Sequence, residues 1–173
     1  MQITEEEKNT LLLTAFSFSP EARELYKKWF TNPQNQRMMG FIDNTFDDTD
    51  IDRWKESVEK STSQIMYNII LTPSKQLIGM CSMTLLPDNL TGELEILIGE
   101  KKYRNQGLGT VAIQLLLNDC FERLDLKKVI VKVYADNIAA IKCYKKIGFC
   151  QVDYFANQDT DILILEKVKK YSM

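Results

Sequence analysis

The feature that most constrains this chain is a change of hydrophobic period at Gly107. Residues 96–99 form an apolar run of strand length. After Gly107, apolar residues recur every three and four positions, at Leu108, Val111, Ala112, Leu115 and Leu116. The first pattern is typical of a buried strand and the second of an amphipathic helix. The sequence therefore predicts a strand, a short basic turn and a helix in immediate succession.

The start of this helix is suited to bind a phosphate. The first N–H groups of a helix have no partner inside it, its dipole favours an anion, and glycine allows a close approach to the backbone. The lysine of a Walker loop is absent, whereas residues 107–112, GLGTVA, match the dinucleotide pattern G-x-G-x-x-A. An NAD-binding protein is a remote alternative, because too few residues follow for a complete doubly wound sheet.

The rest of the chain alternates between the two patterns. Three apolar blocks with short turns, at 64–71, 77–86 and 92–99, predict an antiparallel meander. Further strands are expected at 10–16, 128–134, 149–155 and 161–168, and helices at 20–30, 49–60, 108–123 and 136–147, the last ended by Gly148. These elements predict an α/β or α+β fold, a mixed sheet flanked by helices. With 173 residues and no linker-like tract, we expect a single domain over 1–173.

The absence of histidine narrows the chemistry. It excludes His-based acid–base catalysis and most zinc sites, so proton transfer falls to Tyr, Glu, Asp, Lys, Cys or water, and we expect no metal. A net charge of −2 gives no general attraction to nucleic acid.

The four cysteines lack metal-ligand spacing, and no apolar run has the length of a membrane span. We expect a cytoplasmic protein with no nucleic-acid or membrane partner, and leave a homodimer open.

A second polar cluster lies in the predicted helix 136–147. Asn137 and Tyr144 are seven residues apart, which places an amide and a phenol on one helix face about 10 Å apart. Together with the glycine turn, this cluster carries a resemblance. Through Arg104-x-x-Gly107-x-Gly109 and Asn137-x-x-Ala140-x-x-x-Tyr144-x-x-x-Gly148-Phe149, the sequence resembles the GNAT superfamily of N-acetyltransferases. Trp29 and Asn32-Pro33 after an early strand and helix look like the branch of ribosomal-protein and spermidine acetyltransferases.

The resemblance implies direct transfer of an acetyl group from acetyl-CoA to a primary amine. It implies a mostly antiparallel sheet in which two parallel strands, 95–99 and 128–134, splay apart around the coenzyme. It further implies Tyr144 as the acid that protonates the CoA thiolate and Glu95 as the candidate base. The implied coenzyme contacts are the backbone of Ile96, Leu97 and Ile98 on the pantetheine arm, the N–H groups of Arg104, Asn105, Gln106, Gly107, Leu108, Gly109 and Thr110 on the pyrophosphate, and the side chains of Asn137 and Tyr144.

The acceptor remains open among a polyamine, an amino sugar and a peptide or protein N-terminus. The resemblance implies that the segment 30–52 and the late strands near Phe155 select the acceptor. The segment holds Met38, Met39, Phe41 and Phe46 together with Asp43, Asp47, Asp48, Asp50 and Asp52. These residues form either an apolar site with an acidic rim, or core aromatics with helix-capping aspartates. A non-catalytic acyl-CoA-binding or sensing module is the alternative to an enzyme.

Overall fold

A seven-stranded sheet runs through the computed structural model, which describes residues 11–40, 46–72, 74–156 and 161–170. The strand order is β1-β2-β3-β4-β5-β7-β6. All neighbouring strands are antiparallel except β4 and β5, so the predicted mixed, mostly antiparallel sheet is confirmed. The strands are β1 (Leu11–Ala15), β2 (Gln64–Leu71), β3 (Gln76–Leu85), β4 (Thr91–Ile98), β5 (Lys128–Tyr134), β6 (Cys150–Phe155) and β7 (Ile162–Val168).

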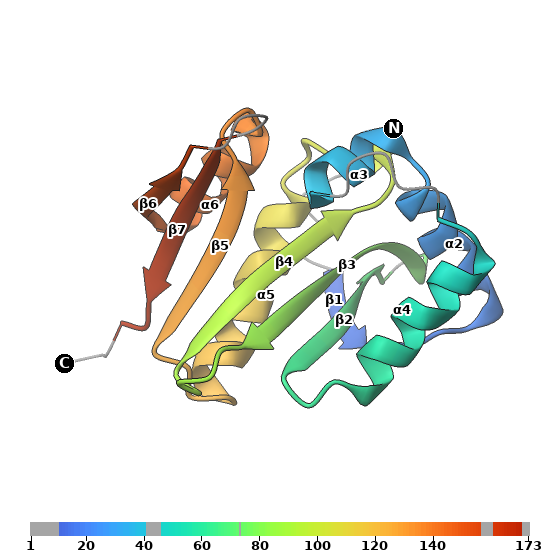
Figure 1. Ribbon diagram of the computed structural model, residues 1–173, viewed down its shortest axis with the longest axis horizontal. Helices are drawn as coiled ribbons and strands as arrows, with labels where there is room; N and C mark the ends of the chain where they lie inside the picture. Colours follow the sequence, from blue (N-terminus) through green and yellow to red (C-terminus); the bar gives the residue numbers. More distant parts are fainter. Residues whose placement is uncertain (1–10, 41–45, 73, 157–160, 171–173) are drawn as a thin grey trace.

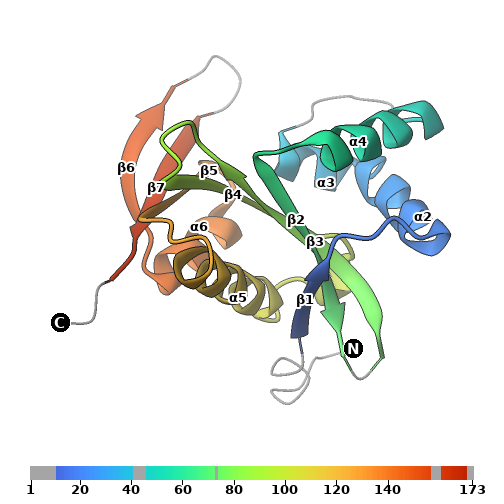
Figure 2. The ribbon, with the colours of Figure 1, turned by 90° about the horizontal axis from the view of Figure 1, so that it is seen from below.

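Helices cover the two faces of this sheet unequally (Figure 2). The long helix α5 (Leu108–Glu122) and α6 (Ile138–Ile147) lie on one face and pack on the larger core. The helices α2 (Pro20–Phe30), α3 (Pro33–Met39) and α4 (Asp48–Lys60) lie on the other face and cover only the half near β2 and β3. Among the described residues no helix covers that face of β5, β7 and β6, and β6 is exposed along its whole length.

The parallel strands β4 and β5 stay together for only three residues. Thr91–Glu93 of β4 pair with Lys128–Ile130 of β5, whereas β4 pairs with β3 as far as Ile98. Beyond Glu93 the two strands diverge, as Figure 1 shows. Among the described residues, one edge of β4 therefore has no strand partner over its second half, at the position where the resemblance expects the coenzyme.

The structure differs from the predicted helices at two places. Helix α2 ends at Phe30 as predicted, but Asn32 and Pro33 then begin α3, which was not predicted. Asn32 caps the N–H groups of Gln34 and Asn35, and proline suits the first helical position. The last helix begins at Ile138 rather than at residue 136. Asn137 is thus the N-cap of α6 and not a residue on its face.

Candidate active site

A cavity of about 840 Å³ occupies the space between the diverging strands. One side of it is formed by β4, the start of α5 and α6, and the other by residues of β2, α3 and α4. Most of the site residues predicted from the sequence line this cavity: Glu95, Ile96, Leu97, Ile98, Arg104, Asn105, Gly107, Gly109, Thr110, Asn137 and Tyr144. Two do not: the Leu108 side chain is buried in the core, and the Gln106 side chain donates to the carbonyl of Lys102.

The turn before α5 has the backbone of an anion site. Asn105 and Gly107 both have left-handed φ angles, of 58° and 83°. Left-handed residues within a turn direct N–H groups to a common side, where they form a concave anion-binding nest. The N–H groups of Leu108, Gly109 and Thr110 follow in the first helical turn, where they have no partner inside the helix.

Gly109 is not required by the packing of the chain itself. A Cβ added at this position would have only the Ile98 Cγ1 atom within 4 Å, at 4.0 Å. A glycine inside a helix is nevertheless less favourable than alanine by about 1 kcal/mol. The open space beside this backbone is what the close approach of a ligand needs.

Arg104 has another contact pattern than the sequence suggested. Its backbone N–H donates to the carbonyl of Lys101, 3.1 Å away, so this N–H group is not available to a pyrophosphate. Its guanidinium donates to the carbonyls of Ile98 and Gly99, at 2.8 and 3.0 Å, and to the side-chain oxygen of Asn35. Burial lowers the pKa of this guanidinium. Arg104 therefore ties the turn to the end of β4 and to α3.

Asn35 was missed by the sequence analysis. It is 1% exposed, and its amide group donates to the carbonyl of Gly99 while its oxygen accepts from Arg104. No motif marks an asparagine in the middle of a short polar helix. Its partners are 64 and 69 residues away in the chain, so only the fold shows that they meet.

Tyr144 presents a buried phenol to the cavity. The side chain is 6% exposed and packs edge-on against Phe149, with ring centroids 5.5 Å apart. Its hydroxyl makes no hydrogen bond to any residue that the structure describes. Burial raises the pKa of Tyr144 well above its usual range, and the charges of Cys143 and Glu95 raise it further. The hydroxyl therefore keeps its proton at neutral pH and is available as a proton donor.

Glu95 lies on β4 with its side chain exposed to the same cavity. One carboxylate oxygen accepts a hydrogen bond of 3.2 Å from the hydroxyl of Ser82, its direct partner on β3. This contact orients the carboxylate and leaves other lone pairs directed to the cavity. Asn137 contributes differently: its oxygen accepts from the N–H of Ala140, and its NH₂ group can donate to a ligand.

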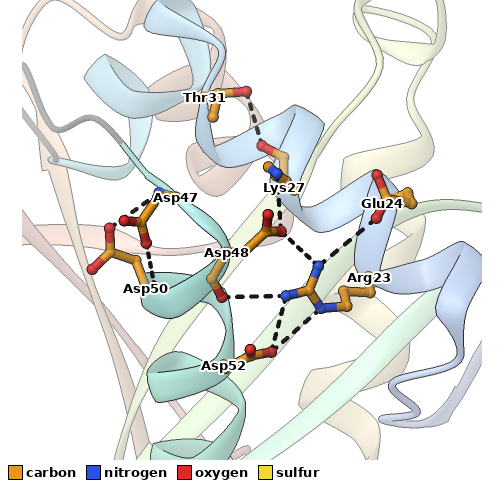
Figure 3. Close-up of polar contacts among 8 residues, drawn as sticks. All are labelled: Arg23, Glu24, Lys27, Thr31, Asp47, Asp48, Asp50 and Asp52. Carbon is orange, nitrogen blue, oxygen red and sulfur yellow. Dashed lines mark hydrogen bonds and ion pairs between the residues drawn. The ribbon is translucent and has the colours of Figure 1, made fainter.

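The aspartates after Phe46 bind their own chain, as Figure 3 shows. Asp47 and Asp50 form a capping box at the start of α4, and the N–H of Asp50 lowers the pKa of Asp47. Asp48 accepts from Lys27 and Arg23, which lower its pKa, and Asp52 accepts from Arg23. Among the described residues this cluster is structural, in line with the capping interpretation. Phe41 and Asp43 lie outside the described residues.

A comparison with known families is now informative. Residues 10–150 match the model of the acetyltransferase (GNAT) domain. The chain belongs to the GNAT N-acetyltransferases. Among similar proteins, the N-acetyltransferase 9-like protein of Caenorhabditis briggsae is 25% identical over 148 residues, which cover 79% of this chain and 74% of that protein. Alpha/beta-tubulin-N-acetyltransferase 9 of Mus musculus is 39% identical over 70 residues, 40% of this chain and 29% of that protein.

The fold of this GNAT enzyme is shared by solved structures. Spermidine N-acetyltransferase from Vibrio cholerae, in complex with CoA and spermine, superposes with a TM-score of 0.81, at 17% identity and over 92% of this chain and 96% of that chain. The single parallel strand pair is unlike a doubly wound dinucleotide fold, which argues against the NAD alternative. Within the described ranges, no helix is long and apolar enough to cross a membrane, and no group of His, Cys, Asp or Glu side chains is arranged to hold a metal.

Proposed function

We propose that this N-acetyltransferase uses acetyl-CoA to acetylate a primary amine, with Tyr144 as the general acid and Glu95 as the general base. The observation that carries the proposal is that one cavity reaches the free N–H groups at the start of α5, the open edge of β4, and both side chains. A single ligand in this cavity could therefore contact an anion site, a row of backbone groups and an acid–base pair.

The residues on the α5 and α6 side fit coenzyme A. The helix start suits a pyrophosphate, and Lys142 and Lys146 of α6 line the same cavity and add positive charge. The unpaired edge of β4 near residues 96–98 offers N–H and C=O groups for the two amides of a pantetheine arm. The NH₂ group of Asn137 is a further donor.

Acetyl-CoA supplies an acetyl thioester as the acyl donor. Glu95 accepts the proton that the amine nitrogen loses as its bond to the acetyl carbon forms, and β4 N–H groups stabilise the oxyanion. Tyr144 donates its proton to the departing sulfur, and the products are an amide and a free thiol. A phenol pKa of about 10 exceeds a thiol pKa of about 8.5, but a dry site raises both, so the transfer remains within reach of general acid catalysis.

The acceptor within this proposal is a polyamine, an amino sugar or a peptide N-terminus. The Mus musculus relative is named for tubulin and the Vibrio cholerae structure for spermidine, so the similarities support more than one class. Within this proposal the three classes share one requirement, which is a neutral amine beside Glu95.

The test is to mix pure protein with acetyl-CoA and amines of the three classes, follow thiol release, and measure CoA binding by calorimetry. We expect thiol release that requires both substrates. CoA binding without turnover of any amine would favour a sensing module, and the absence of CoA binding would refute the proposal.

A further inference from the structure

The acceptor side of the cavity is lined with methionines. Of the seven methionines in the chain, four line this one cavity: Met38 and Met39 of α3, Met66 of β2 and Met80 of β3. Phe30, Phe46 and Trp54 complete the apolar wall. Methionine is flexible and polarizable, so a methionine-rich wall adapts to apolar groups of several shapes.

Charge on this side is sparse. Glu95 is the one acidic residue among the described residues that line the cavity. Lys132 lines it as well and is bound to Glu93 at 2.9 Å. A polyamine would bring one or more additional ammonium groups into this space, where no second carboxylate of the described residues is available to pair with them. The nearby aspartates are already bound to Arg23 and Lys27.

Hydrogen-bonding groups are also few on this wall. Its hydrogen-bonding groups among the described residues are the side chains of Gln64, Ser82, Glu95 and Lys132 and the indole N–H of Trp54, and Ser82 and Lys132 already have partners. An amino sugar carries several hydroxyls that lose water on burial and need replacement partners. An apolar group directly beside the reacting amine matches this wall better.

Next to this wall the sheet face is open. Lys132 is 52% exposed, and beyond it the strands β7 and β6 have no helix over the same face within the described part of the chain. An amine that continues into a longer chain therefore has a surface along which that chain leaves the cavity. A small monoamine would not reach this surface.

Resting on the proposed function, we propose that the acceptor is the N-terminus of a peptide or protein with an apolar first side chain. The methionine wall holds that side chain, Glu95 faces the α-amino group, and the following residues leave across β5 and β7. Several apolar first residues are accepted, because the wall is flexible.

The experiment compares initial rates of thiol release at fixed acetyl-CoA. The acceptors are hexapeptides that differ only in the first residue (Met, Leu, Phe, Ser or Asp), spermidine, glucosamine and hexylamine. We expect kcat/KM for the Met, Leu and Phe peptides to be at least ten-fold higher than for every other acceptor. Equal or faster turnover of spermidine, glucosamine, hexylamine or the Ser and Asp peptides would overturn the inference while the proposed function stands. No turnover of any amine would instead refute the proposed function.

Two variants test the wall directly. Met39→Gln and Met66→Gln replace an apolar side chain by a polar one of similar length, on two different elements. We expect KM for the Met peptide to rise three-fold or more, with kcat and CoA affinity little changed. Leu12→Gln, at a 50% exposed position on β1 that does not line the cavity, is the matched control. Unchanged KM in both folded variants would overturn the inference, and if either variant unfolds, the acceptor series with the unmodified chain decides alone.

Discussion

The guanidinium of Arg104 donates to the side-chain oxygen of Asn35 and so joins the turn before α5 to helix α3. The turn belongs to the proposed coenzyme side and α3 to the acceptor side. Arg104 and Asn35 are 69 residues apart in the chain, and their contact connects the two halves of the site.

This contact gives the first prediction. Asn35→Ala leaves a partly buried guanidinium without its side-chain acceptor, and we expect a loss of about 1–3 kcal/mol in the free energy of unfolding. CoA affinity should fall several-fold, because the turn is less well held. Denaturant unfolding and calorimetry measure the two effects. Gln34→Ala, at the exposed neighbouring position in α3, is the control; equal behaviour of the two variants would contradict the role of Asn35.

Tyr144→Phe removes the proposed acid and keeps the ring. We expect turnover to fall by about 10² or more, with little change in CoA affinity, as is usual for a general acid. Since the pKa of Tyr144 is raised, its protonation should not limit the rate at or below neutral pH. Tyr154→Phe, on the exposed strand β6, is the matched control. Wild-type turnover in Tyr144→Phe would remove this residue from the chemistry.

Glu95→Gln tests the base. We expect turnover to drop by about 10² or more near pH 7 and to recover partly towards pH 9, because an α-amino group with a pKa of about 8 then loses its proton to solvent. Glu93→Gln changes a carboxylate two residues earlier on β4, which is bound to Lys132. A pH–rate profile of both variants separates them. If the loss at Glu95 is the same at every pH, the residue acts otherwise than as a base.

Gly109 and Gly99 should respond to alanine in opposite ways. Gly109→Ala meets no crowding, so unfolding stability should be unchanged or up to about 1 kcal/mol higher, while CoA affinity falls at least ten-fold. Gly99→Ala would place its Cβ 2.1 Å from ring atoms of the buried Trp29, so stability should fall by about 1–3 kcal/mol. Thermal unfolding and CoA titration measure both. Full CoA affinity in Gly109→Ala would contradict the placement of the pyrophosphate.

Asp48→Asn tests whether the acidic cluster contacts the acceptor. Lys27 and Arg23 lower the pKa of Asp48 in the folded chain, so its stabilising contribution is present above the pKa of an unfolded aspartate, near 4, and is lost as pH falls through the lower folded value. The variant should therefore lose less stability between pH 4 and pH 2 than the wild type, with unchanged kcat/KM for every acceptor. A raised acceptor KM would place this cluster in the site.

Most of the fold followed from local patterns. The change of period at Gly107 predicted α5, and the structure has this helix within a residue or two. Helix α2 was likewise predicted at residues 20–30, and its start has a local cause, the cap by Ser19 and the proline that follows. Helix α3 was not predicted, because seven mostly polar residues show no apolar period and Pro33 suggests a break as readily as a start. The meander was predicted from the length and spacing of three apolar blocks, and the splayed strand pair from the family resemblance.

The site was predictable where backbone chemistry defines it and less so elsewhere. The glycines of the turn before α5 mark positions that depend on nearby residues, whereas Asn137 was expected on the face of α6 and is its N-cap. The side-chain partners of Arg104 and the gathering of Met38, Met66 and Met80 on one wall depend on contacts between distant elements. The aspartates were ambiguous, since a carboxylate that caps a helix and one that binds a cation look alike in sequence.

Because β4 and β5 pair over only three residues, the sheet of this protein is weakly connected at its centre. Three paired positions join its two halves, and along the remaining edge of β4 the amides and carbonyls have no neighbouring strand in the part of the chain that the structure describes. Coenzyme A bound there would form hydrogen bonds with these groups in place of a neighbouring strand, and would thereby stabilise the sheet as well as react. Binding of coenzyme A should therefore slow amide hydrogen exchange along both β4 and β5. The same binding event would then make the sheet more rigid and bring the acyl donor into the site.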